Sequence, residues 1–106
     1  MKNILNVGDI LVGEWHYTMT YPVWFKVTKV TDKQARAVRL RSVMVRSTDG
    51  GYNQQGYEAP AMEQRVGERG DHVIRMTEYG LATGSKYDYF HLEKWDGKPR
   101  WADHCD

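Results

Sequence analysis

The stretch VWFKVTKV, residues 23–30, carries the strongest strand signal in the chain. Its apolar residues at positions 23, 25 and 27 alternate with Trp, Lys and Thr at positions 24, 26 and 28. A period of two residues places the two sets on opposite faces of a β-strand. The alternation predicts that Phe25 is buried in a core and that Trp24, on the opposite face, is the more exposed ring.

A second strand is expected after a short turn at residues 31–33, TDK. The segment QARAVRLRSVMVRS, residues 34–47, alternates at both ends, but Leu40 departs from the alternation, which predicts a β-bulge near Val38 and Arg39. Its Ala, Arg and Leu residues also favour a helix. Because a short turn after a strong strand indicates a hairpin, we expect two antiparallel strands here.

Further strands are expected within residues 4–15, interrupted by a Gly-Asp turn, and at residues 72–76 and 87–92. Residues 47–71 are rich in Gly, Gln and Glu and weak in apolar content, so we expect a long polar loop or irregular insertion there. Residues 77–86 are expected to form a loop or one helical turn. Five or six short strands with frequent glycines predict a mainly β fold, a small antiparallel SH3-like barrel.

The 106 residues are enough for one domain, residues 1–106, with one modest core. The 15 basic and 14 acidic residues give a formal charge of +1, which excludes a strongly acidic DNA mimic and a strongly basic histone-like protein. Cys105 is the only cysteine, a usage typical of a reducing cytoplasm. No apolar run is long enough for a signal peptide or a membrane span, so we expect a cytoplasmic protein without membrane contact.

The candidate catalytic and metal-binding residues lack the spacing that their chemistry needs. The tail ADHCD, residues 102–106, contains side chains that bind zinc, but His104 and Cys105 are adjacent and have no second pair of ligands. We expect a frayed polar tail there. The carboxylates of residues 58–71 are interleaved with two arginines, a pattern typical of solvated ion pairs. The sequence therefore predicts no enzyme, no metal site and no cofactor.

Basic residues gather on the predicted hairpin. Four arginines lie between residues 36 and 46, and three lysines lie on the neighbouring strand and turn. If the hairpin pairs as predicted, Lys26 and Arg36 point outward together and Trp24 shares their face. Charge beside a ring favours nucleic acid, because charge binds phosphate and a ring stacks on a base. The candidate binding residues are Tyr21, Trp24, Lys26, Arg36, Arg39 and Arg41.

Two segments also resemble a known group of proteins. They are VGDILVGEWHYTMTYPVWFKVTKVTDKQARAVRL, residues 7–40, and WDGKPRW, residues 95–101. Both resemble parts of a family of small uncharacterised proteins encoded by bacteriophages, prophages and other bacterial mobile elements. The resemblance implies a phage-type accessory protein with a small barrel fold, located in the cytoplasm of a bacterial host. It implies no mechanism.

Two kinds of partner are compatible with these patterns. In the first, a non-enzymatic accessory protein contacts nucleic acid or a host nucleoprotein through the basic hairpin. In the second, the protein binds a host protein and inhibits either a bacterial defence system, as an anti-CRISPR-like protein would, or a replication factor. Exposed rings mark an interface in either case.

Overall fold

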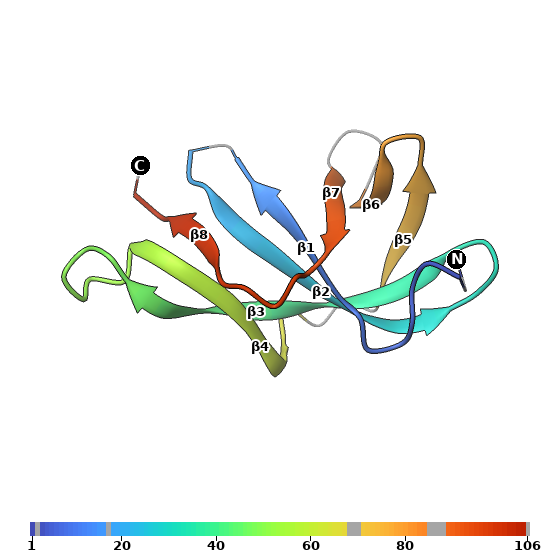
Figure 1. Ribbon diagram of the computed structural model, residues 1–106, viewed down its shortest axis with the longest axis horizontal. Helices are drawn as coiled ribbons and strands as arrows, with labels where there is room; N and C mark the ends of the chain where they lie inside the picture. The colour runs from blue at the N-terminus through green and yellow to red at the C-terminus, as the bar shows by residue number, and fades with distance from the viewer. Residues whose placement is uncertain (2, 17, 68–70, 85–88, 106) are drawn as a thin grey trace.

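The computed structural model describes residues 1, 3–16, 18–67, 71–84 and 89–105, and these residues contain strands and no helix. In this described part of the chain, eight strands follow one another (Figure 1). They are β1 (Ile10–Trp15), β2 (Tyr21–Val30), β3 (Ala35–Ser47), β4 (Gln55–Arg65), β5 (His72–Thr77), β6 (Gly80–Gly84), β7 (Tyr89–Lys94) and β8 (Arg100–Asp103). The mainly β fold predicted from the sequence is confirmed.

Six of the strands close into an antiparallel barrel. Around it, β1 pairs with β2, β2 with β3, β3 with β5, β5 with β6 and β6 with β7. The barrel closes where β7 pairs back onto β1, joining Leu11 to Lys94 and Val12 to Glu93. This small barrel is consistent with the SH3-like barrel predicted from the sequence.

Two of the expected segments differ in detail from the structure. Residues 80–84, expected in a loop or helical turn, form β6 instead, because they pair with β5 on one edge and β7 on the other. Pairing on both edges stabilises a strand that is too short to show a clear sequence period. Of the strand expected at residues 87–92, the first two residues lie outside the described part of the chain.

The two remaining strands, β4 and β8, extend the sheet beyond the barrel. The second half of β3 pairs with β4, β4 pairs with β8, and an isolated bridge joins Asp103 to Thr20, just before β2. The prediction of a loop throughout residues 47–71 is therefore wrong for residues 55–65. An outer strand buries only part of one face, so low apolar content is compatible with a strand. The buried residues of β4 are Gly56, Glu58 and Pro60.

The buried apolar side chains of the described residues form two hydrophobic cores, on opposite faces of the β1–β2–β3 sheet. The barrel core contains Leu5, Leu11, Val23, Phe25, Val27, Ala35, Ala37, Ile74, Leu81 and Leu92. The second core contains Val12, Trp24, Val38 and Leu40, with Ile10 and Trp95 packed against it. Because β2 lies between the two cores, its four consecutive residues 22–25 are all buried.

The second core explains the irregular pattern in β3. The register between β2 and β3 is unbroken opposite Val38 and Arg39 and shifts only between Val27 and Lys29, so the predicted bulge is wrong in position. Leu40 departs from the early pattern of β3 because it packs in the second core rather than in the barrel. On the other edge of β3, the pairing with β4 shifts just beyond the predicted position, between Leu40 and Ser42.

Trp24 is fully buried, so the prediction that it is the more exposed ring is wrong, whereas the predicted burial of Phe25 is confirmed. Alternation places the two rings on opposite faces, but it cannot reveal that the second face is also covered. Trp95 meets Trp24 edge to face, with 5.3 Å between ring centroids. The Trp24 indole N–H donates a hydrogen bond of 2.9 Å to Ser42 Oγ.

The C-terminal segment is held by specific contacts. Ala102 is fully buried, and Thr20 and Asp103 exchange two backbone hydrogen bonds. His104 Nε2 lies 2.8 Å from a carboxylate oxygen of Glu58. The expected frayed tail is therefore wrong for the described residues up to Cys105, because β8 is fixed to β4 along one edge and to the start of β2 at its end.

Candidate functional site

Charge is divided unequally between the β2–β3 hairpin and the rest of the chain. Residues 21–47 contain seven Lys and Arg residues and one acidic residue, Asp32. From totals of 15 and 14, the remainder contains eight basic and thirteen acidic residues. The hairpin therefore has a formal charge of +6 and the remainder −5, which together give the net +1.

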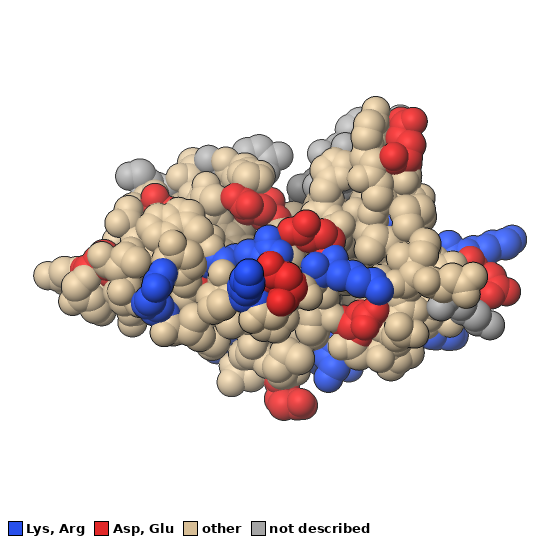
Figure 2. All heavy atoms as spheres, viewed as in Figure 1, with Lys and Arg blue, Asp and Glu red and all other residues tan. Residues whose placement is uncertain are grey.

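Within the part of the chain that the structure describes, none of the basic residues of the hairpin forms an ion pair. Elsewhere, Lys94 Nζ lies 3.6 Å from an Asp9 carboxylate oxygen, and Arg100 lies 2.8 Å from Glu93. Figure 2 shows such mixed charge across the middle of one face, where the connection from β7 to β8 crosses the molecule in Figure 1. The hairpin, by contrast, contains one acidic residue, Asp32, against seven basic residues.

The basic residues of the hairpin lie on both of its faces, so the single basic surface predicted from the sequence is wrong. Lys26 and Arg36 lie outside the barrel, on the face opposite the barrel core. Arg39 pairs with Phe25 and so lies on the other face, where Arg41 follows two residues later. The division follows from the two cores, because β3 buries Ala35 and Ala37 in the barrel core and then Val38 and Leu40, on its other face, in the second core.

The two predicted aromatic site residues are not exposed beside these charges. Trp24 is buried in the second core. Tyr21 is half-buried against the barrel core, and its ring stacks on Trp15 at 6.2 Å and on His104 at 5.2 Å between centroids. Neither ring is therefore available as an open platform for a base or a partner side chain.

A ring pair made of the half-buried Tyr57 and the exposed Trp101 lies instead beside the second half of β3. Arg46 of β3 is opposite Tyr57 of β4, which is opposite Trp101 of β8. The Arg46 guanidinium carbon lies 4.2 Å from the Tyr57 ring centroid, and the two rings meet edge to face at 5.6 Å. Trp101 is 44% exposed. We define the arginine–aromatic face as Arg39, Arg41, Val43, Arg46, Tyr57 and Trp101.

The register places these side chains on one side of the sheet. Val43 is opposite Ala59, and Tyr57 lies two residues from Ala59, so alternation puts all three on the same side. Arg41 lies two residues before Val43 on that side of β3. The shift in pairing between Met44 and Arg46 returns Arg46 to it, opposite Tyr57.

Sequence reasoning missed Tyr57 and Trp101 because both lie in segments that were expected to be irregular. The stretch GYEAP, residues 56–60, does alternate, with Tyr57 and Ala59 separated by the buried Glu58. This signal is short and polar, and only the pairing of β4 with β3 and β8 reveals it as a strand.

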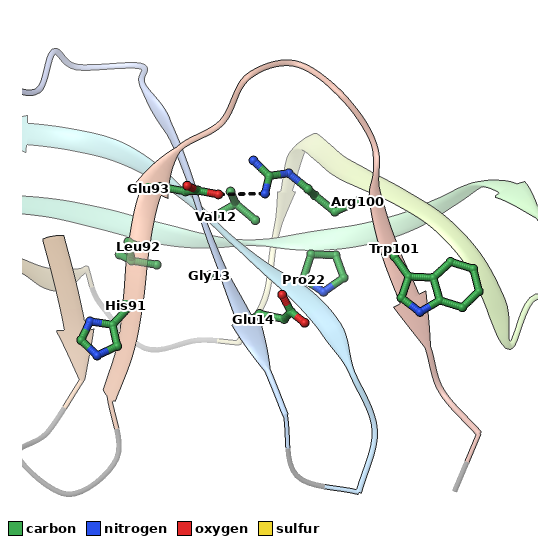
Figure 3. A pocket seen from close by; sticks show the side chains of 9 residues that line it. All are labelled: Val12, Gly13, Glu14, Pro22, His91, Leu92, Glu93, Arg100 and Trp101. Carbon is green, nitrogen blue, oxygen red and sulfur yellow. Dashed lines mark hydrogen bonds and ion pairs between the residues drawn. The ribbon is translucent and has the colours of Figure 1, made fainter. Parts of the chain in front are cut away.

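A groove with a volume of about 450 Å³ lies between β7 and β8 (Figure 3). Figure 3 shows Arg100 reaching across the groove toward Glu93, while the Trp101 ring lies on the other side of β8. Arg100 also lies 3.7 Å from Asp96. A hydrogen bond from the backbone N–H of Lys98, together with the Arg100 charge, holds the pKa of Asp96 below its usual 3.8. Two carboxylates thus neutralise the arginine of the groove.

Pro22 accounts for the opening of this groove. The bridge between Thr20 and Asp103 is antiparallel, and continuing its register would bring Pro22 opposite Trp101. Proline has no N–H to donate, so a regular ladder cannot continue there. Past the bridge β2 and β8 form no further pairing among the described residues, and Pro22 lines the groove instead.

A polar network links the second core to the C-terminal segment. Ser42 Oγ donates to Glu58 Oε1 at 2.9 Å, and His104 Nε2 lies 2.8 Å from Glu58 Oε2. Ser42 and His104 therefore both contact the carboxylate, and a nucleophile–base pair would require them to contact each other. In the described ranges of the chain, no three His, Cys, Asp or Glu side chains are grouped so as to hold a metal ion.

Comparisons of the chain with family models, curated proteins and solved structures give no match. The described residues include no helix of the length and apolarity needed to cross a membrane. The charges and rings of the hairpin and of the arginine–aromatic face are therefore the features from which a function is inferred.

Proposed function

We propose that this protein is a non-enzymatic binding protein of the phage accessory type that contacts nucleic acid through the basic residues of the β2–β3 hairpin. The observation that carries the proposal is the segregation of charge, with +6 on the hairpin and −5 on the remainder. Lys and Arg side chains in such excess over acidic residues favour phosphate, because each contact releases condensed counterions from the nucleic acid.

Three further observations support this proposal. Neither β2 nor β3 contains an acidic residue, so an anionic backbone that lies along them meets no like charge from these strands. Four of the seven basic residues are arginines, whose planar guanidinium groups bind phosphate oxygens in pairs. The Ser42–Glu58–His104 network, whose members are engaged with one another, supports a structural rather than a catalytic role for these residues.

Fluorescence anisotropy with a labelled oligonucleotide at salt concentrations between about 50 and 200 mM tests the proposal. We expect log K to fall linearly with log salt. Replacing Arg39 and Arg41 with Ala should reduce the slope by about one to two units, since each phosphate contact contributes about 0.7 to 0.9. Lys94→Ala is the matched control, because this lysine is already paired with Asp9 and its loss should leave the slope unchanged.

The alternative partner is a host protein of defence or replication, which this protein would inhibit. Val43 and Val45, 39% and 53% exposed beside Arg46, favour it, because apolar side chains next to Arg, Tyr and Trp are typical of binding hot spots. No anisotropy change at about 50 mM salt, where phosphate contacts are strong, would contradict the nucleic-acid proposal. A host-protein complex that survives nuclease treatment would then support the alternative.

A further inference from the structure

We propose that the nucleic acid is single-stranded and that it lies along the arginine–aromatic face with a base stacked on Trp101. This inference rests on the proposed function, to which it adds the form of the nucleic acid and the ring that binds it. Its basis is that the charges and the exposed ring occupy neighbouring strands on one side of the sheet.

Trp101 is the ring of this face that is open to a base. The Tyr57 ring is covered by the Arg46 guanidinium at 4.2 Å and contacts Trp101 at 5.6 Å, so it is engaged on two sides. Trp101 lies on the outer strand β8 and remains 44% exposed. An indole offers a large π-face, on which every base can stack without regard to sequence.

The arginines form a row along β3 that can follow a phosphate backbone. From Arg39 to Arg46 the strand rises by roughly 20 Å, at about 3.3 Å per residue. Trp101 lies two strands away from this row, about 10 Å at the usual strand spacing. The phosphate backbone of the nucleic acid would therefore contact the arginines of β3, and a base would contact the Trp101 ring of β8.

The acidic residues of β4 and β8 do not neutralise the row of arginines on β3. Glu58 of β4 is buried and bound to Ser42 and His104. Asp103 of β8 is half-buried and accepts the backbone N–H of Cys105. Glu63 is the remaining acid of these strands, against three arginines of the face.

The form of the surface favours a single strand over a duplex. In a duplex the bases stack on one another, so their faces are hidden from an aromatic ring, whereas a single strand can splay its bases outward. Reading a duplex through its major groove takes an inserted helix or β-ribbon. The arginine–aromatic face consists of side chains on the surface of a sheet, and the described residues contain no helix.

The experiment compares an oligothymidylate of about 20 nucleotides, longer than the usual binding site of one small domain, with a duplex of equal length, by anisotropy. We expect the single strand to bind at least about tenfold more tightly. Trp101→Ala should weaken its binding by about 5- to 150-fold with an unchanged salt slope, because stacking releases no counterions. Trp101→Phe, which keeps a ring, should restore most of the affinity. Tyr79→Ala removes a ring that is 79% exposed in the turn between β5 and β6, away from this face, and should change nothing.

Arg46→Ala provides a second variant on the same face and should weaken binding while reducing the salt slope by about one unit. Equal affinity for duplex and single strand, or wild-type binding by Trp101→Ala, would overturn the inference. In either case a steep salt dependence would leave the proposed function standing. If neither oligonucleotide binds at low salt, the proposed function itself fails, and the inference fails with it.

Discussion

At the scale of single residues, Trp24 stabilises the second core in two ways. Its ring packs against Trp95 and against the aliphatic residues Val12 and Leu40. Its N–H is paired with Ser42, which in turn donates to the carboxylate of Glu58. Burial of the ring without that hydrogen bond would leave a polar group unpaired in the interior.

We expect Trp24→Ala to reduce the free energy of unfolding by about 3–5 kcal/mol, the usual cost of truncating a buried aromatic side chain. Phe25→Ala should cost a similar amount, because both rings are buried, each in its own core. Trp101→Ala, a half-exposed Trp, is the control and should cost about 1 kcal/mol or less. Urea unfolding of the three variants measures the differences, and a Trp24→Ala variant as stable as wild type would contradict the second core.

At the scale of elements, β8 is held from three directions. Its residues pair with β4, its last residue bridges to Thr20, and the following His104 binds Glu58. The Glu58 carboxylate is 6% exposed, so its two hydrogen-bond partners replace the water that it lost. The C-terminal segment is therefore fixed to β4 and to the start of β2, and His104 is linked to Trp24 of the second core through Glu58 and Ser42.

A chain that ends at Ala102 should accordingly be less stable than the full chain. It loses two backbone hydrogen bonds with Thr20, at about 0.5–1.5 kcal/mol each, and leaves Glu58 without one buried partner, at about 1–3 kcal/mol. We expect a loss of about 2–6 kcal/mol in thermal or urea unfolding. His104→Ala in the full chain separates the two contributions, and an unchanged melting temperature for the shortened chain would show that the segment is dispensable.

The turn between β3 and β4 should respond to acid. A hydrogen bond from Ser47 and the backbone N–H groups of Gln54, Gln55 and Asn53 hold the pKa of Asp49 below its usual 3.8. A depressed pKa in the folded state adds stability that is present above the unfolded pKa and is lost as the pH falls through the folded pKa. We expect an NMR titration of the Asp49 carboxyl to give a midpoint below 3.8, and Asp49→Asn to abolish that step. A midpoint at or above 3.8 would contradict the turn geometry.

At the scale of the whole molecule, the two cores share β2 and β3 and should unfold together. Ile74→Ala in the barrel core and Leu40→Ala in the second core should each cost about 2–5 kcal/mol. Because neither core can lose the hairpin without exposing the other, both variants should shift one common transition. Unfolding followed by tryptophan fluorescence and by far-UV circular dichroism checks this. Two transitions that respond separately to the two variants would mean that the cores are independent units.

The part of this architecture that was predictable follows local sequence patterns. The β2–β3 hairpin and the burial of Phe25 follow from alternation and a short turn, which act over a few residues. The burial of Trp24 depends on Trp95, which is distant in sequence and covers it. The strand at residues 55–65 depends in part on β8, which is also distant and pairs with it. For the site, the arginines were visible as a cluster, but their division between two faces was not, because it depends on which side each core occupies.

The shared hairpin has a consequence for how the chain folds. The barrel closes when β7 pairs with β1, and β8 is fixed when Asp103 pairs with Thr20. Trp95, which packs against the second core, is also distant in sequence from β2 and β3. Because loop-closure entropy must be overcome before such distant contacts form, folding is expected in the range of about milliseconds to seconds. The ribosome synthesises β2 and β3 before β7 and β8. Until the later strands are made, the two apolar faces of the β2–β3 hairpin are exposed to solvent. The period of greatest aggregation risk for this chain is therefore its own translation.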